Sequence, residues 1–132
     1  MFVNIYDKED NLIGIHLTEE AINEGKNFLT RPEMTLQLGA FYLKKDSIIT
    51  NHFHNEYDRN VKVTGEVLVV LEGELKVDFY DKDLNFLKNV IVKKHETILM
   101  FGGGHGIEVS KDTKFIEIKQ GPFNEELDKE HF

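Results

Sequence analysis

The chain has 132 residues, of which 40% are hydrophobic and 30% are charged, with a formal net charge of −8 at pH 7. This balance is typical of one folded globular domain and excludes a largely disordered chain. The acidic charge is spread along the chain without a Lys/Arg cluster, which disfavours nucleic acid and anionic membranes as partners. The lack of cysteine excludes disulfides and thiolate metal ligands.

Targeting signals are not evident at the start of the sequence. The first ten residues contain no basic segment followed by an apolar one, and nowhere do about 18 apolar residues run together. We therefore expect a cytoplasmic protein with a single domain over residues 1–132.

Short apolar or alternating stretches, separated by turn-forming residues, predict an all-β sandwich or barrel. The predicted strands are Phe2–Tyr6, Leu12–Leu17, Met34–Leu43, Ser47–His54, Gly65–Glu72, Glu74–Tyr80, Phe86–Val92, Thr97–Phe101, Gly106–Val109 and Phe115–Gln120. One short N-terminal helix is expected over Thr18–Leu29, with Thr18 as its N-cap and Glu20 in its first turn. The acidic stretch Asn124–Phe132 is expected to be a frayed helical turn or a tail, and we assign it no function.

Two histidines flank a phenylalanine in His52-Phe53-His54. On a strand, residues two positions apart project from the same face, so both imidazoles could bind one metal ion while Phe53 points to the other face. A chance pair among the six histidines of the chain is the alternative.

One carboxylate, Glu66, begins the apolar strand that follows, and this strand ends at the turn Glu72-Gly73. An ionised carboxylate at the start of a buried strand is costly unless it is paired or coordinated, and a metal ion held by two imidazoles would compensate it. A solvent-exposed strand end is the alternative for Glu66.

A further candidate ligand follows three glycines in Gly102-Gly103-Gly104-His105-Gly106. Glycines permit positive φ and let the backbone approach a site closely, so the pattern favours a functional position for His105. A hydrogen bond of His105 within the turn is the alternative.

Together these segments resemble the cupin superfamily, whose first motif contains HxH, then a Glu, six residues and a Gly, and whose second contains PxGxxH. Glu66, followed by six residues and Gly73, is similar to the first motif, and Gly102-Gly103-Gly104-His105 to the second. The resemblance covers about residues 47–120 and implies a jelly-roll β-barrel, also called a double-stranded β-helix. In that fold three histidines and one glutamate bind one divalent metal ion, here His52, His54, Glu66 and His105.

The spacing between the ligands departs from the family pattern. Eleven residues separate His54 from Glu66, where the family has a much shorter gap, so residues 55–64 would form an enlarged loop. Asp58 stands closer to the family spacing and is a rival ligand, but we favour Glu66 because a strand and the Gly73 turn follow it. Two further positions differ from the family, Met100 in place of proline and His95 in place of glycine.

A site of three imidazoles and one carboxylate suits Fe, Mn, Zn, Ni or Co as the divalent ion. A narrower resemblance, in the GGHG turn and in the ending Glu117–Phe123, is to small cupins found with surface-polysaccharide or nucleotide-sugar biosynthesis genes. This resemblance carries no mechanism across, but a metal ion that polarises a carbonyl or stabilises an enediolate would support an enzyme that isomerises or epimerises a sugar or another small polar substrate. The alternatives are a non-heme Fe(II) dioxygenase and a non-enzymatic cupin whose metal is structural or anchors a ligand.

Several polar side chains are candidates for substrate contacts. Glu117 and Lys119 share one face of their strand; if it faces inward they are catalytic acid/base groups or bind a substrate carboxylate, and otherwise they form a solvent-facing pair. Gln37 has the same ambiguity. In the loop after the histidine pair, Tyr57 and Arg59 suit an anionic or hydroxylated substrate, or else belong to a solvated hairpin.

Two expectations concern the remaining residues and the assembly. Histidines outside the motifs are interpreted as surface or incidental, namely His16, His95 and His131. Exposed strand edges need cover, so we expect a homodimer.

Overall fold

The computed structural model describes residues 2–132, and these divide into two compact units. Unit 1 contains the described residues up to Ala21 together with Val63–Phe132, and unit 2 contains Ile22–Lys62. Within residues 2–132 the fold is all-β, with antiparallel sheets and no α-helix; its helical element is a single 3-10 turn, η1 (Glu19–Ala21). Among these residues, no helix has the length and hydrophobicity that a membrane span requires.

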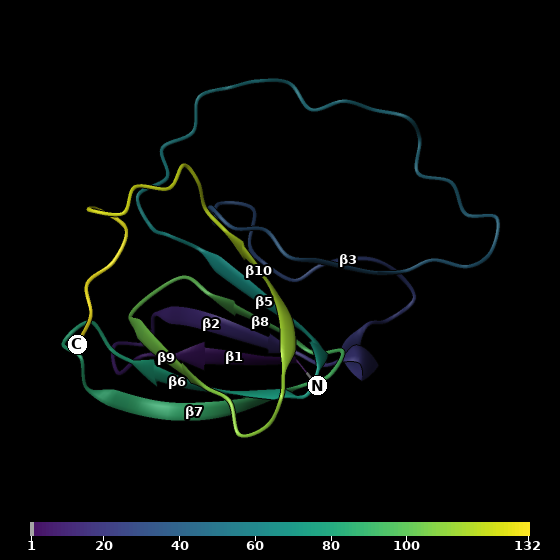
Figure 1. The fold of residues 1–132 in the computed structure, drawn as a ribbon. Coiled ribbons are helices and arrows are strands. Elements are labelled where there is room, and N and C mark those ends of the chain that lie inside the picture. Colours follow the sequence, from purple (N-terminus) through teal and green to yellow (C-terminus); the bar gives the residue numbers. More distant parts are fainter. Residues whose placement is uncertain (1) are drawn as a thin grey trace. The chain divides into compact units, whose positions relative to one another are not determined.

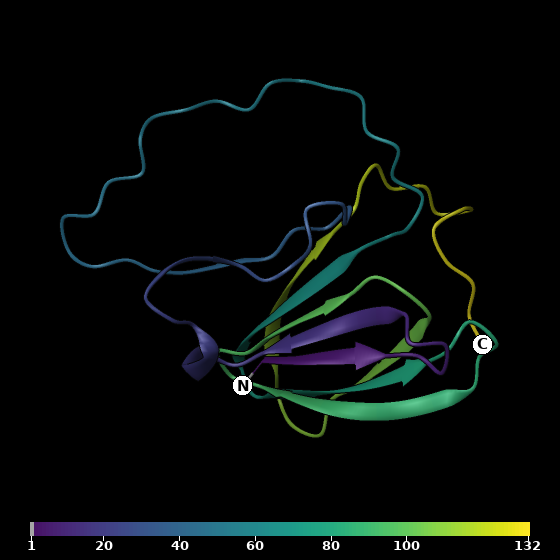
Figure 2. The same ribbon diagram turned by 180° about the vertical axis from the view of Figure 1, so that it is seen from behind.

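Unit 1 is built from two antiparallel sheets (Figures 1 and 2). In the described residues the larger sheet has the strand order β1-β2-β8-β5-β10 and the smaller β7-β6-β9. The strands are β1 (Phe2–Tyr6), β2 (Leu12–Leu17), β5 (Glu66–Glu72), β6 (Glu74–Tyr80), β7 (Phe86–Lys93), β8 (Thr97–Met100), β9 (Gly104–Glu108) and β10 (Lys114–Lys119). The sheets are separate ladders over the described chain, so the strands do not close into one continuous barrel.

The hydrophobic core of unit 1 contains residues of both sheets. On β6, Leu75, Val77 and Phe79 are fully buried and alternate with half-buried polar residues, which is the period-two pattern of a strand with one core-facing side. The core cluster consists of Ile5, Ile13, Leu68, Val70, Leu75, Val77, Phe79, Val92, Ile98 and Met100. Leu68 and Val70 therefore show which face of β5 points inward.

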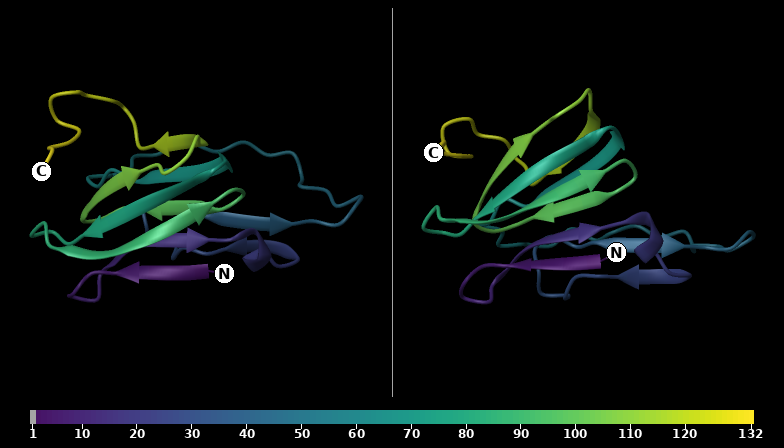
Figure 3. Two further views of the ribbon diagram at one scale, coloured as in Figure 1. Left: turned by 60° about the horizontal axis from the view of Figure 1, so that its bottom comes forward. Right: turned by 90° about the horizontal axis from the view of Figure 1, so that it is seen from below.

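Two hairpins of unit 1 close with the same kind of five-residue turn. Asp7 at the start of one turn accepts hydrogen bonds from the N–H groups of Glu9 (2.8 Å) and Asn11 (2.9 Å), and Asp81 accepts the same pair from Asp83 and Asn85, both at 2.9 Å. The fourth residue of each turn has positive φ, 60° and 65°. In both views of Figure 3 the two turns lie at the same end of unit 1.

Side-chain ion pairs join these two turns. Lys82 Nζ lies 2.7 Å from Glu9 Oε1, and Lys8 Nζ lies 3.8 Å from Asp81 Oδ2. The two hairpins, which are far apart in the sequence, are thus tied together by reciprocal contacts.

Unit 2 contains one antiparallel strand pair, β3 (Gly25–Phe28) and β4 (Gly39–Tyr42), within the described residues. Phe28 and Phe41 pack edge to face with ring centroids 5.5 Å apart. The predicted strand Met34–Leu43 is therefore confirmed only in its second half.

The predicted helix Thr18–Leu29 is wrong. Only Glu19–Ala21 forms a 3-10 turn, closed by a hydrogen bond of 3.1 Å from the Ala21 N–H to the Thr18 carbonyl. Gly25 has φ of 103°, outside the helical region, and the residues after it pair with β4. Strand pairing with a distant segment therefore overrides the local helical pattern.

The predicted strand Ser47–His54 is also wrong. The chain there makes a turn, with a hydrogen bond of 3.1 Å from the Ser47 N–H to the Lys44 carbonyl, and continues without regular secondary structure to Thr64. A strand is stabilised by a hydrogen-bonded neighbour and by burial of one face. Ile48 and Phe53 are 84% and 83% exposed, so the segment does not gain that burial.

The eight remaining predicted strands are confirmed in unit 1, with ends that differ by at most two residues. Phe2–Tyr6, Leu12–Leu17 and Glu74–Tyr80 have the predicted bounds. The all-β prediction is therefore borne out.

Candidate functional site

Glu66 and His105 form a close pair in unit 1. Glu66 begins β5. Because residues two positions apart on a strand share a face, Glu66 lies on the same inward face of the larger sheet as the buried Leu68 and Val70. His105 on β9 stands opposite the buried Phe79 of β6, which gives it the inward face of the smaller sheet. Glu66 Oε2 and His105 Nε2 are 2.9 Å apart.

The Glu66 side chain is only 14% exposed, and that of His105 is 31% exposed. The hydrogen bond from His105 lowers the pKa of Glu66, and the charges of His105 and Lys119 act in the same direction, whereas burial and Asp128 oppose the shift. Glu66 is therefore held as a carboxylate beside an imidazole, a pair of oxygen and nitrogen donors suited to a borderline divalent metal.

Strand β10 adds two polar side chains to the same inward face. Lys119 pairs with Glu66 and Glu117 pairs with Leu68 in the β10–β5 register, and directly opposed residues share a face. The sequence left open whether Glu117 and Lys119 face inward or toward solvent, and the register places them on the inward face. Glu117 is solvent-exposed because β10 is an edge strand.

Glu66, His105 and Glu117 line a cavity of about 910 Å³ in unit 1. Its wall is formed by the starts of β5 and β9, the β6–β7 turn, Glu117 and the C-terminal residues. The lining residues are Val63, Thr64, Glu66, Tyr80, Asp81, Lys82, Leu84, Met100, Gly102, Gly103, Gly104, His105, Gly106, Ile107, Glu117, Asp128, Lys129, Glu130, His131 and Phe132.

The glycines before His105 have separate steric roles. Gly103 has φ of 64°, and a Cβ there would collide with the carbonyl oxygen of Tyr80. A Cβ on Gly104 would lie 2.8 Å from the ring of Phe132. The glycine run therefore lets β9 start against β6 and leaves room for the C-terminal residues.

The other predicted metal ligands, His52 and His54, belong to unit 2. Both are exposed, and their rings meet edge to face with centroids 5.2 Å apart although they do not lie on a strand. His52 Nδ1 is 2.8 Å from the carbonyl oxygen of Thr50. Because a carbonyl can only accept, Nδ1 donates, which leaves the Nε2 lone pair free to bind a metal ion.

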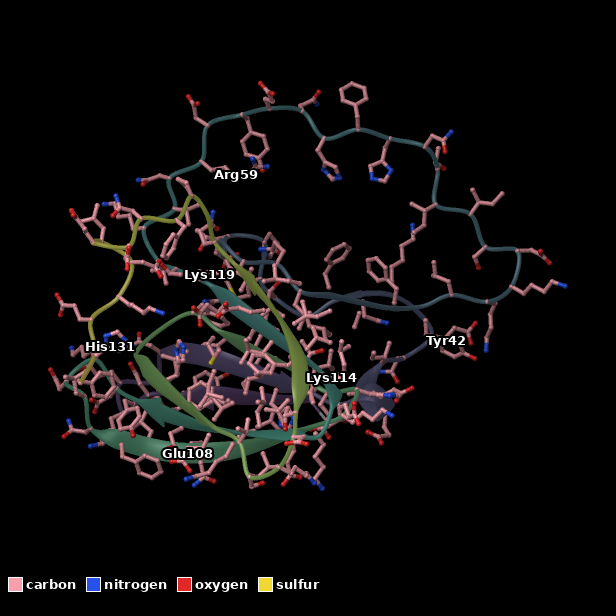
Figure 4. All side chains as sticks on the ribbon, viewed as in Figure 1. Tyr42, Arg59, Glu108, Lys114, Lys119 and His131 are labelled. Carbon is pink, nitrogen blue, oxygen red and sulfur yellow. The ribbon has the colours of Figure 1, made fainter. Side chains whose placement is uncertain are left out.

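The predicted substrate-binding residues also lie in unit 2. The Arg59 guanidinium stacks 3.7 Å from the centroid of the Tyr57 ring, and both side chains, like that of the rival ligand Asp58, are exposed. Figure 4 labels Arg59 on its extended segment. The Gln37 amide instead donates to the carbonyls of Met34 (2.7 Å) and Arg31 (3.0 Å), so it organises its own loop.

Across residues 2–132, the structure brings no three or more His, Cys, Asp or Glu side chains together as a metal cluster. Of the four predicted ligands, it places Glu66 beside His105 in unit 1 and His52 beside His54 in unit 2. Two partial donor sets are thus described, one in each unit.

One of the histidines interpreted as incidental is a buried structural residue. His16 is 8% exposed and its Nε2 lies 2.8 Å from Glu96 Oε2, whereas His95 makes an exposed pair of 3.2 Å with Glu19. Strand β2 lies between β1 and β8 and is buried on both faces from Ile13 to Leu17, so its place inside the sheet, and not an alternating pattern, buries His16.

The C-terminal residues are the part of the cavity that sequence reasoning missed. Lys119 Nζ lies 3.2 Å from Asp128 Oδ2, and Phe132 packs edge to face on Tyr80 with centroids 5.0 Å apart. An acidic stretch soon after a strand lysine was the only sequence signal. Figure 4 shows labelled Lys119 on β10 and His131 on the C-terminal segment.

Comparison of the chain with protein-family models, curated proteins and solved structures finds no match in any of the three sets.

Proposed function

We propose that this protein is a metal-binding cupin, with unit 1 as its jelly-roll sandwich and one divalent ion bound at the inward end of β5 and β9. The observation that carries the proposal is the 2.9 Å contact between Glu66 Oε2 and His105 Nε2. These two residues come from facing sheets and from the two sequence motifs that resemble the cupin pattern. Both side chains line one cavity.

The chemistry of the donors supports a metal ion at this pair. Glu66 is largely buried and ionised, and a buried carboxylate gains from coordination as well as from a hydrogen bond. We propose that His52 and His54 supply the other two donors; this part of the ligand set rests on the HxH motif. The Nδ1 contact of His52 with Thr50 leaves its Nε2 available for such a role.

We further propose that the protein is an enzyme that isomerises or epimerises a small polar substrate such as a sugar. A volume of about 910 Å³ lies within the range of small-molecule sites, roughly 300–1,000 Å³. A bound divalent ion would supply Lewis-acid polarisation of a substrate oxygen. Glu117 and Lys119, on the same strand face as Glu66, are the proposed proton-transfer groups.

The metal site is tested by elemental analysis of protein purified without added metal. Wild type is expected to contain about one equivalent of a divalent ion, and His105→Ala and His52→Ala are expected to lose most of it. His95→Ala, which removes an exposed histidine paired with Glu19, is the matched control and should retain the metal. Unchanged metal content in His105→Ala would refute the assignment.

The reaction class is tested separately by turnover with and without dioxygen. An isomerase or epimerase is expected to act on a sugar panel under anaerobic conditions with Mn(II) or Zn(II). A strict requirement for Fe(II) and dioxygen would identify a dioxygenase instead. Metal binding without turnover in either condition would identify a non-enzymatic cupin.

A further inference from the structure

The C-terminal strap, which we define as Asn124–Phe132, folds back onto the cavity of unit 1. Asn124 Oδ1 accepts hydrogen bonds from the N–H groups of Glu126 (3.0 Å) and Leu127 (3.2 Å), and the Asn124 carbonyl accepts one from Asp128 (2.9 Å). This single turn directs Asp128 toward β10. At the other end of the strap, the Phe132 ring packs on Tyr80.

An ion pair between Asp128 and Lys119 joins the strap to β10. The two side chains are 11% and 20% exposed, and their charged atoms are 3.2 Å apart. Lys119 stands directly opposite Glu66 in the β10–β5 register, and its positive charge helps to lower the pKa of Glu66. The bond to Asp128 also raises the pKa of Lys119, which keeps it protonated.

Carboxylates dominate the charged side chains that line the cavity, and Lys119, which is not among the lining residues, is held beside the cavity by the lining residue Asp128. The lining contains five carboxylates but only two lysines in the described chain, and one of these, Lys82, is bound to Glu9 at 2.7 Å. The other, Lys129, belongs to the strap. With five carboxylate side chains against two lysines, the lining repels an anion, and the ammonium of Lys119 is bound to Asp128 outside the lining.

We propose that Asp128 is a specificity-determining residue: by holding Lys119, it keeps the cavity acidic and selects uncharged or cationic ligands rich in hydroxyl or amino groups over phosphate-bearing ones. The inference rests on the proposed function, since it names the substrate class of that site. It implies that a free sugar or amino sugar fits the cavity better than its phosphate ester or nucleotide derivative does.

The test is calorimetric titration of inorganic phosphate into metal-free protein in the presence of a chelator. Asp128→Asn keeps the shape of the side chain but removes the negative charge that holds Lys119, and phosphate is expected to bind at least about tenfold more tightly than to wild type. Asp128→Ser, which also lacks the charge, is expected to give the same gain, so the test does not depend on one variant folding. Circular dichroism checks the fold of each variant.

Two further variants separate this role from a general effect of net charge. Glu126→Gln removes one negative charge from an exposed residue of the same turn and is expected to leave phosphate affinity unchanged. Adding Lys119→Gln to Asp128→Asn is expected to abolish the gain. The proposal is overturned if neither Asp128 variant gains affinity, if Glu126→Gln gains as much, or if the gain survives the loss of Lys119. Because no metal is present, these results do not depend on whether His105 binds one.

Discussion

At the scale of single residues, Glu66 and His105 are expected to depend on each other for stability. In metal-free protein at pH 7, His105→Ala removes the hydrogen-bond partner of a largely buried carboxylate. We expect it to lower the free energy of unfolding by about 1–2 kcal/mol, the typical cost of a buried polar group left without its partner. Urea denaturation measures this loss.

A double-mutant cycle tests whether the effect comes from the pair. In the His105→Ala background, Glu66→Gln should lower the free energy of unfolding by less than it does in wild type, or even raise it, because it removes an unpaired charge. Strictly additive losses in the His105→Ala/Glu66→Gln protein would mean that the two side chains do not interact in solution.

Within the β6–β7 turn, Leu84 is a residue whose backbone conformation disagrees with its type. It has φ of 65° and is 52% exposed, whereas its counterpart in the β1–β2 turn is Asp10, with φ of 60°. Asparagine tolerates positive φ better than leucine does. We therefore expect Leu84→Asn to raise the free energy of unfolding by roughly 0.5–1 kcal/mol, measured by urea denaturation.

Leu84→Val is the matched control, because a β-branched residue is more restricted at positive φ than leucine is. It should be less stable than wild type. A loss of stability in Leu84→Asn equal to that in Leu84→Val would contradict the turn geometry.

The same turns predict a pH dependence at the scale of an element. Hydrogen bonds from Asn85 lower the pKa of Asp81, and hydrogen bonds from Asn11 lower that of Asp7. A carboxyl group whose pKa is depressed by folding stabilises the protein above its unfolded pKa, about 3.9 for Asp, and this stabilisation is lost as the pH falls through the folded value. Acid should therefore weaken both hairpin turns.

Asp81→Asn measures this contribution. At pH 7 its urea midpoint is expected to lie clearly below that of wild type, and the difference should shrink as the pH is lowered from about 4 to 2.5. Asp83→Asn, at an exposed position of the same turn, is the control for the loss of one charge. A difference between Asp81→Asn and wild type that stays constant with pH would exclude the mechanism.

At the scale of the whole molecule, Phe79 is the largest fully buried side chain of the core. Its ring fills the space above Gly14, where an added Cβ would lie 2.8 Å from the ring and 2.9 Å from the Leu99 carbonyl oxygen. Phe79→Ala should lower the free energy of unfolding by about 3–5 kcal/mol, because it leaves a cavity between two rigid sheets. Chemical denaturation measures this loss of free energy.

Gly14→Ala gives the converse test of the same packing. The added methyl group must displace the Phe79 ring or the backbone, so this variant should also be less stable than wild type. A free energy of unfolding that is unchanged in Gly14→Ala would show that β2 does not pack closely against Phe79.

The sequence was sufficient for most of unit 1 because the relevant signals are local. Strict alternation predicted Glu74–Tyr80, and the register of β10 with β5 then decided the face of Glu117 and Lys119, which alternation alone left open. Unit 2 was predicted poorly because Gly25–Phe28 becomes a strand only through pairing with Gly39–Tyr42, a contact that no local pattern specifies.

Parts of the candidate site were predictable to different degrees. Glu66 and His105 are 39 positions apart in the sequence, and their contact was anticipated only through the resemblance of two motifs. The contact of Asp128 with Lys119 had no such motif, because it requires the chain to reverse direction after β10. Long-range pairs of this kind are set by tertiary packing.

Binding of a metal ion at Glu66 and His105 can be followed by nuclear magnetic resonance of the six histidine rings during addition of Zn(II). At one equivalent, the ring nitrogen signals of His105, His52 and His54 are expected to move to metal-bound positions, while those of His16, His95 and His131 stay unchanged. An unchanged His105 signal at one equivalent would contradict metal binding at this pair.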